Sequence, residues 1–294
     1  MSTPRKHHFV PQFLLRHFAD STESLVVHRL DPPARYIAKV RDVGHENDAH
    51  TRRRRDGTID RTTLESSMGE VEGAAARSLG ELDQGGELTT DIKSDLAWFA
   101  ALQWHRSRYL LNSVAREVGR NDEVTPGEFQ TGLLDAVFVP FFSAWRLRFD
   151  DHARPKDRWD SIVSALYSME WTVCRYRADA LVVGDQTVCM YGTRPGGRAT
   201  VNDAWARHGI GIGWGDVGRV TIALTPRLGL HMHAKGVSAR LTAPAFNRTT
   251  IFNARRLVAH SPEWPAGREN LQAAFDDAIS KQRWLAPMFI KNVL

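Results

Sequence analysis

Residues 219–226, RVTIALTP, and residues 229–235, GLHMHAK, decide the fold class, because both are β-branched or alternating and a short turn separates them. Two earlier stretches have the same character: residues 169–176, MEWTVCRY, and residues 179–192, DALVVGDQTVCMYG. Short strands joined by turns predict a mainly antiparallel sheet within a β-rich part that spans residues 160–262.

The part before this sheet, residues 61–150, has helical periodicity instead. Apolar residues recur at helical spacing from about Thr62 to Leu82, and Thr62-Thr63-Leu64-Glu65 fits a capping box at the start. Further helices are expected over about 90–116, 126–150 and 159–167. Residues 1–60 predict an opening segment, short strands and a loop, and residues 265–285 a closing helix. We therefore expect a single α+β domain over residues 1–294, with the helical half packed on the sheet.

Composition narrows the class of protein without giving a reaction. The 294 residues carry a formal net charge of +5, which mildly favours a polyanionic partner such as nucleic acid. The arginines Arg52 to Arg55 would contact phosphates or form a solvated loop. Cys174 and Cys189 lack metal or redox spacing and are expected to be packed thiols in a reducing compartment. No apolar run reaches the ~20 residues of a membrane span, and we expect a cytoplasmic protein with no membrane partner.

The best polar signal lies on the helix expected over 90–116. Gln103 and Arg106 share one helical face with four apolar residues: Ile92, Leu96, Phe99 and Leu110. A buried guanidinium is costly unless it is paired, so either an acidic side chain or an anionic ligand should bind Arg106.

Two carboxylates on the preceding helix are seven residues apart and share a face. Glu65 and Glu72 could hold a divalent metal or act as acid and base. The capping box is an alternative role for Glu65, whereas Glu72 lacks a local role and is a good partner for Arg106.

The opening segment carries a second polar group. His7 and His8 precede a helix that Pro11 should begin, and in an extended chain only one of them faces inward. An inward imidazole would bind metal or transfer protons, and the alternative is a structural terminus. Gln12 and Arg16, four apart, share one face of that helix.

Three features of the second half are candidates for a site. Asp185 ends an apolar strand, which suits either a ligand position or a turn. His231 and His233 alternate in a strand, where metal binding is less expected than an exposed sheet face. The G-x-G-x-x-G match at residues 213–218 is rejected as a dinucleotide site, because a strand and not a helix should follow it.

The segment His7-His8-Phe9-Val10-Pro11-Gln12 with Phe18 resembles the opening signature of a family of bacterial and fungal proteins that is catalogued as a domain of unknown function. Glu65 and Glu72 are similar to its two-glutamate helix, and Gln103 with Arg106 to its Q-x-x-R element. Leu181 to Val188 is similar to a strand ending in Ser-Asp-x-Pro, although Gly184 and Thr187 depart from that pattern. Ile222 to Pro226 is similar to the family's later strand that contains a proline. Asn247 and Asn253 lie where the family has an asparagine, and the resemblance implies that they are site residues.

Together these residues predict a metal-dependent phosphodiester hydrolase of nuclease type, for which bacterial defence or toxicity is one setting. A histidine of the His7–His8 pair would be base or ligand. Glu65, Glu72 and Asp185 would hold a divalent ion, Mg²⁺ or Mn²⁺ ahead of Zn²⁺. Arg106 would stabilise charge, and the residues expected to orient substrate are Gln12, Arg16, Gln103, Asn247 and Asn253. The alternatives are a non-catalytic module that binds nucleic acid, nucleotide or protein, and a structural ion-pair network.

Overall fold

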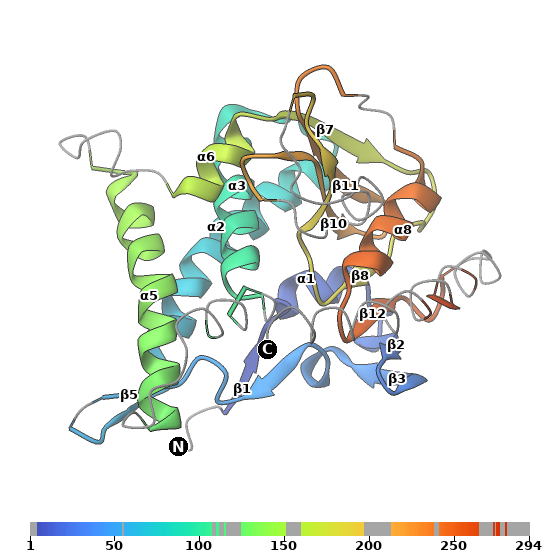
Figure 1. Ribbon diagram of the computed structural model, residues 1–294. Helices are drawn as coiled ribbons and strands as arrows, with labels where there is room; N and C mark the ends of the chain where they lie inside the picture. Colours follow the sequence, from blue (N-terminus) through green and yellow to red (C-terminus); the bar gives the residue numbers. More distant parts are fainter. Residues whose placement is uncertain are drawn as a thin grey trace. The chain divides into compact units, whose positions relative to one another are not determined.

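The structure of the chain is a computed structural model that describes residues 5–54, 56–107, 125–150, 160–196, 213–237 and 241–264, with single residues 110, 111, 115, 273, 275, 276 and 280. Helices and antiparallel sheets both occur, which confirms the predicted α+β class (Figure 1). Contacts group the chain into two compact units, residues 1–13 with 42–170 and residues 14–41 with 171–294. The single domain stays a prediction about how these units are joined.

The first unit is built on helices at nearly the predicted positions. They are α2 (Thr63–Asp83), α3 (Thr90–His105), α5 (Pro126–Leu147) and α6 (Ser161–Tyr167). Helix α3 is central, because α2, α5 and α6 all pack against it. Its residues 96–102 are all buried, which explains why a helix with apolar side chains on every side is stable here.

The start of α2 differs from the predicted capping box. The side chain of Thr62 accepts no hydrogen bond at the helix start. Asp60 replaces it, since its Oδ1 accepts from the backbone N–H groups of Thr62 at 3.2 Å and Thr63 at 3.0 Å. Glu65 is therefore not needed for capping and is available for another partner.

Helix α3 ends earlier than the sequence pattern suggested. Arg106 is its C-terminal cap residue, with φ of −86° and ψ of −2°. Most of the predicted continuation to residue 116 lies outside the described residues. The predicted inner face is confirmed, because Ile92, Leu96, Phe99, Gln103 and Arg106 are all buried.

Two short ribbons complete the first unit. Strand β1 (Lys6–His8) pairs antiparallel with β4 (His45–Asn47), placing His7 opposite Glu46 and His8 opposite His45. Strand β5 (Arg52–Arg53) pairs with β6 (Ile59–Asp60) and packs against α5. The first ribbon brings the opening histidines next to the segment that the sequence pattern marked only as a loop.

The second unit contains two four-stranded antiparallel sheets. One has the order β7 (Glu170–Arg175), β11 (Leu228–His233), β10 (Val217–Thr225), β9 (Cys189–Thr193). The other has the order β3 (Pro33–Lys39), β2 (Ser24–Leu30), β12 (Leu257–His260), β8 (Val183–Gly184). Helix α8 (Ala243–Asn253), which the sequence reading left unassigned, packs against β8, β9 and β10 (Figure 1). Helix α1 (Gln12–His17) crosses the boundary between the units.

The structure corrects one prediction and confirms two others in this unit. His231 and His233 are 1% and 3% exposed, so the predicted exposed sheet face is wrong. Cys174 and Cys189 are buried free thiols, as expected. The G-x-G-x-x-G match runs into β10, which confirms its rejection. The predicted closing helix lies almost wholly outside the described residues.

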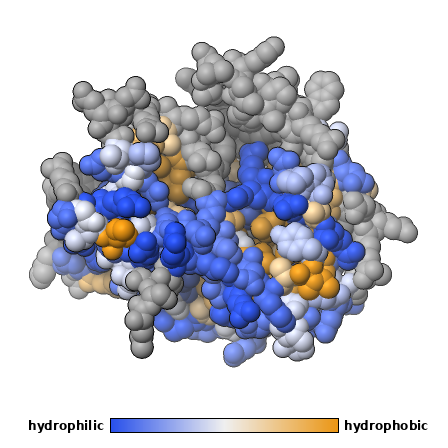
Figure 2. Space-filling view, turned by 90° about the horizontal axis from the view of Figure 1, so that it is seen from below, coloured by the Kyte–Doolittle hydropathy of each residue, from blue (hydrophilic) through white to orange (hydrophobic). Residues whose placement is uncertain are grey.

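On the face shown in Figure 2, hydrophobic residues form small patches among hydrophilic ones. Large exposed apolar side chains include Ile37 at 69% and Phe149 at 71%. Within the described residues, no helix has the length and apolar character needed to cross a membrane.

Candidate functional site

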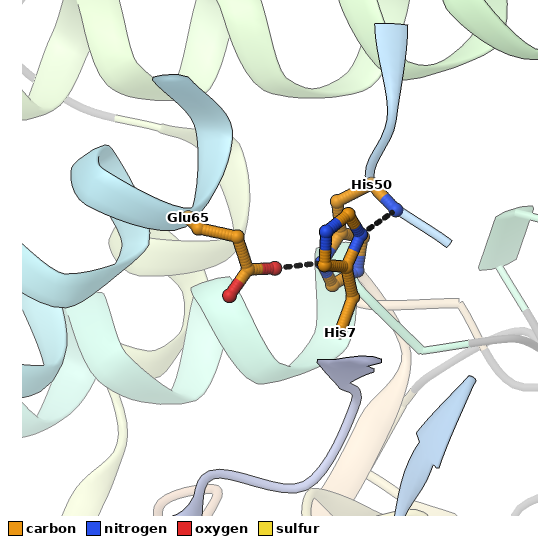
Figure 3. Close-up of side chains that lie close together, drawn as sticks. All are labelled: His7, His50 and Glu65. Carbon is orange, nitrogen blue, oxygen red and sulfur yellow. Dashed lines mark hydrogen bonds and ion pairs between the residues drawn. The ribbon is translucent and has the colours of Figure 1, made fainter. Parts of the chain in front are cut away.

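Two imidazoles and one carboxylate of the first unit form a compact cluster (Figure 3). The rings of His7 and His50 are stacked, with centroids 5.5 Å apart and an interplanar angle of 6°. Nδ1 of His50 lies 2.5 Å from Oε1 of Glu65. The three side chains each offer one ligand atom within 4.8 Å of the others.

Each member of the cluster is held by its own local structure. His7 is on β1, and its Nδ1 accepts a hydrogen bond of 2.8 Å from the backbone N–H of His50. His50 precedes β5 and packs edge-on against Phe138 of α5. Glu65 is in the first turn of α2, which Asp60 caps. The cluster therefore depends on a strand, a turn and a helix start that are far apart in the sequence.

Burial and charge set the protonation of the cluster. Burial lowers the pKa of His7 below its ordinary 6.5, and the opposing charge of Glu65 does not restore it. Burial alone would raise the pKa of Glu65. The hydrogen bond from His50 and the positive charge of Arg106 help to outweigh burial and leave that pKa below its ordinary value. At neutral pH His7 is thus uncharged and Glu65 is ionised.

A second carboxylate near His7 is already neutralised. Asp48 binds Arg61 at 2.8 Å and Arg5 at 2.9 Å. These hydrogen bonds, with that of Thr51, hold the pKa of Asp48 well below its usual range. Its negative charge is therefore compensated by two bound guanidinium groups, whereas the hydrogen-bond partner described for Glu65 is the imidazole of His50.

Arg106, Gln103 and Glu72 form a network of hydrogen bonds, as the sequence predicted for Arg106. Glu72 lies on the same face of α2 as Glu65. Nη1 of Arg106 donates to Oε1 of Glu72 at 2.7 Å, and its Nε and Nη2 donate to Oε1 of Gln103 at 3.3 Å and 3.0 Å. Arg106 is only 2% exposed. An acidic side chain, one of the two expected partners, therefore binds this guanidinium, and Glu72 is not in the histidine cluster.

Other candidates at the start of the chain are held in different ways. His7 and His8 point to opposite sides, as predicted: His7 is buried and His8 is half-buried. Nδ1 of His8 lies 3.3 Å from Nε2 of Gln12, and its ring meets that of His45 edge-on. Arg16 belongs to the second unit, where it is exposed and pairs with Glu23 at 3.2 Å.

Three further candidates belong to the second unit and bind its backbone. Asp185 is half-buried and accepts from the N–H groups of Arg255 and Arg256 at 2.9 Å and 3.0 Å. Burial raises its pKa despite these bonds. Asn247 bonds Ala180 and Val182, and Asn253 donates to a carbonyl within α8. The structure assigns these three residues contacts that hold strands and helix together.

Sequence reasoning missed His50. It lies in the segment read as a polar loop, and its signal was weak: His45 and His50 are two histidines within six residues, without metal-ligand spacing to a third. Only the pairing of β1 with β4 and the turn that follows bring His50 to His7.

Comparison with known proteins places the chain in a family. A family model described as Protein of unknown function (DUF4238) matches residues 6–263. The chain belongs to this family. The match confirms the resemblance expected from the sequence. The matched residues include every candidate site residue of this DUF4238 chain. No curated protein and no solved structure matches it.

The chemistry open to the cluster follows from its donor atoms. Two imidazoles and a carboxylate are ligands that zinc, manganese and iron accept in proteins. A carboxylate bonded to one ring nitrogen also orients an imidazole for proton transfer. Glu65 has 38% of its side chain exposed and links the buried histidines to solvent. The cluster is thus open to solvent at Glu65, more so than the Arg106 network, whose Glu72 side chain is 22% exposed.

Proposed function

We propose that the chain is a phosphodiester hydrolase whose reaction centre is the His7–His50–Glu65 cluster. The observation that carries the proposal is the contact of 2.5 Å between His50 and ionised Glu65, beside the stacked ring of His7. A divalent ion, Mg²⁺ or Mn²⁺, would be held by Glu65 and His50 in place of the proton they share, and it would supply an activated water. This moves the expected metal ligands from Glu65, Glu72 and Asp185 to Glu65 and His50.

The neighbouring network supports this centre as a positioning device. Glu72 lies two turns after Glu65 on α2, and Arg106 binds Glu72 and also lowers the pKa of Glu65 by its charge. Arg106 therefore fixes the face of α2 that presents Glu65. The mildly basic balance of the chain fits an anionic substrate such as nucleic acid.

The first test is thermal unfolding of the full chain with and without Mg²⁺, Mn²⁺ and Zn²⁺. An ion at about 100 times its Kd stabilises the folded state by about 2.7 kcal/mol and raises the midpoint by about 5 °C. We expect this rise in the wild type and its loss in Glu65→Gln. Glu70→Gln is the matched control, because Glu70 is an exposed glutamate of the same helix.

The second readout is cleavage of bis(p-nitrophenyl) phosphate and of single-stranded DNA and RNA. Glu65→Gln should lower the ion-dependent rate by about 100-fold, and Glu70→Gln should leave it unchanged. The proposal fails if no ion changes the midpoint and none of these phosphodiesters is cleaved.

A non-catalytic alternative is favoured by one observation, the burial and internal pairing of Arg106. Removing Glu72 would leave a buried guanidinium unpaired, so Glu72→Gln should cost about 3–5 kcal/mol of unfolding free energy. If the ion effect and the cleavage are absent while this loss is found, the cluster and the network are structural, and the non-catalytic alternative replaces the hydrolase.

A further inference from the structure

The protonation of His7 can be read from its hydrogen bond. The backbone N–H of His50 donates to Nδ1 of His7 at 2.8 Å. A backbone N–H can only donate, so Nδ1 must present a lone pair. A neutral imidazole has one ring proton, which must then be on Nε2. The fixed backbone of the turn therefore selects one tautomer of His7.

This tautomer limits what the other nitrogen can do. Nε2 of His7 is buried and has no hydrogen-bond partner among the described residues. A metal ion needs the lone pair of a deprotonated nitrogen, and an N–H group offers none. As long as the His50 amide is bonded, Nε2 is a donor that needs an acceptor.

We propose that His7 binds substrate through its Nε2–H, donating to a phosphoryl oxygen, and that it is not a metal ligand. The proposal rests on the proposed function for the choice of a phosphoryl oxygen. Any ion at the cluster is held by Glu65 and His50. With one imidazole and one carboxylate from the protein, such a site suits Mn²⁺ or Mg²⁺ with bound waters better than a closed zinc site.

The charges around His7 suit an anionic acceptor once an ion is present. The groups that act on it are Glu65, His50, Asp48 and Arg61. Asp48 is compensated by Arg5 and Arg61, and an ion would compensate Glu65. Because Nδ1 of His7 accepts from the His50 amide, the ring carries a single proton, so its Nε2–H donates as a neutral imidazole and adds no positive charge to the cluster.

The matched variants are His7→Asn and His7→Gln. Asparagine keeps an acceptor for the His50 amide near the place of Nδ1 but has no group at Nε2. Glutamine places an amide N–H near Nε2. With inorganic phosphate as the probe in the presence of Mn²⁺, His7→Asn should bind at least about tenfold more weakly than wild type, and His7→Gln should regain part of that loss. Affinity for Mn²⁺ alone should stay within about threefold of wild type in both variants.

The tautomer is measured directly by ¹⁵N NMR of histidine-labelled protein, with His7→Asn assigning the resonances. We expect an unprotonated Nδ1 and a protonated Nε2 for His7.

Three results would each overturn the inference: a protonated Nδ1, a roughly 100-fold loss of Mn²⁺ affinity in His7→Asn, or phosphate binding unchanged by His7→Asn. Absence of phosphate binding in the wild type would also overturn it, because an internal water would then suffice as the acceptor. If phosphate binds through His7 but no phosphodiester is cleaved, the hydrolase proposal fails and the role of His7 as a donor stands.

Discussion

Half-buried His28 and buried His260 form a pair in which hydrogen bonds again set the tautomers. Nδ1 of His260 lies 2.8 Å from the carbonyl of Ser261, which can only accept, so this nitrogen is protonated. Its Nε2 is then the acceptor for Nε2–H of His28, at 3.1 Å. Burial, followed by the charges of His260 and Arg35, lowers the pKa of His28 to about 4.

This pair predicts a loss of stability in acid. The pKa of His28 is lower in the folded chain than the ordinary 6.5, so the unfolded chain takes up the proton first. The stabilising contribution is fully present above pH 6.5 and is lost as the pH falls towards about 4. Urea unfolding at several pH values should show a smaller decline in His28→Gln than in wild type. Parallel curves for the two proteins would contradict the assignment, and part of the decline should remain because burial also lowers the pKa of His7 and His45.

How a residue is used was harder to predict than where it lies. The helical spacing placed Gln103 and Arg106 on a buried face correctly, because that geometry is local. Which acid binds Arg106 could be guessed, since Glu72 had no other role. His50 could not be found, because its place depends on a turn that brings it to His7 from 43 residues away. For Asp185 the sequence allowed either a ligand position or a turn, and its oxygens accept from backbone amides of a segment about 70 residues later.

The start of helix α2 offers a test of one structural element. Asp60 accepts from two backbone N–H groups there and binds Arg52 at 2.8 Å, whereas the Thr62 side chain caps nothing. Asp60→Ala should lower the free energy of unfolding by about 2 kcal/mol, because it removes a cap. Asp60→Asn should lower it less, and Thr62→Ala should change it by less than about 0.5 kcal/mol.

The reverse order, a large loss in Thr62→Ala and a small one in Asp60→Ala, would restore the capping box and leave Glu65 a capping residue. Chemical denaturation of the three variants decides this. Ion binding gives an independent readout, because the cap lies one turn from Glu65. Asp60→Ala should therefore weaken any Mn²⁺ effect on the thermal midpoint, and Thr62→Ala should not.

Helices were predicted better than strand pairing for a physical reason. Helical periodicity and caps are local, so α2, α5 and α6 lie near their expected positions. Strand order depends on contacts across the chain: β12 pairs with β2, placing His260 opposite Val26, and β8 joins the same sheet. One sheet was expected in the second half, and the described residues of the second unit form two, because alternation within a strand does not indicate which strand pairs with it.

The charge of the whole chain is the remaining property that bears on a partner. The formal net charge is +5, and the arginine run beside the cluster is not uniform. Arg52 is bound by Asp60 at 2.8 Å and Asp135 at 3.0 Å, so it is a structural residue. Arg53 and Arg54 are exposed, and Arg55 lies outside the described residues. The expected solvated loop is wrong for Arg52 and Arg53, which form β5. The side chains of Arg53 and Arg54 are exposed, although Arg54 also lies 3.5 Å from Asp60, and they remain the arginines of this run that phosphate can reach.

If the proposed substrate is a nucleic acid, its binding must weaken as salt rises, because phosphate contacts release counterions. For single strands the slope of log affinity against log salt is about −0.7 per phosphate contact, so Arg53→Gln with Arg54→Gln should reduce the slope by about 1.4. Fluorescence anisotropy with a single-stranded oligonucleotide, over a series of salt concentrations, measures this. Arg227→Gln is the control, since Arg227 is an exposed, ion-paired arginine of the second unit and its replacement should leave the slope unchanged.

If the double variant leaves the slope unchanged, Arg53 and Arg54 are excluded from the binding surface. Binding independent of salt would exclude a polyanion altogether and direct the search for a substrate to small phosphodiesters that the His7–His50–Glu65 cluster alone can hold.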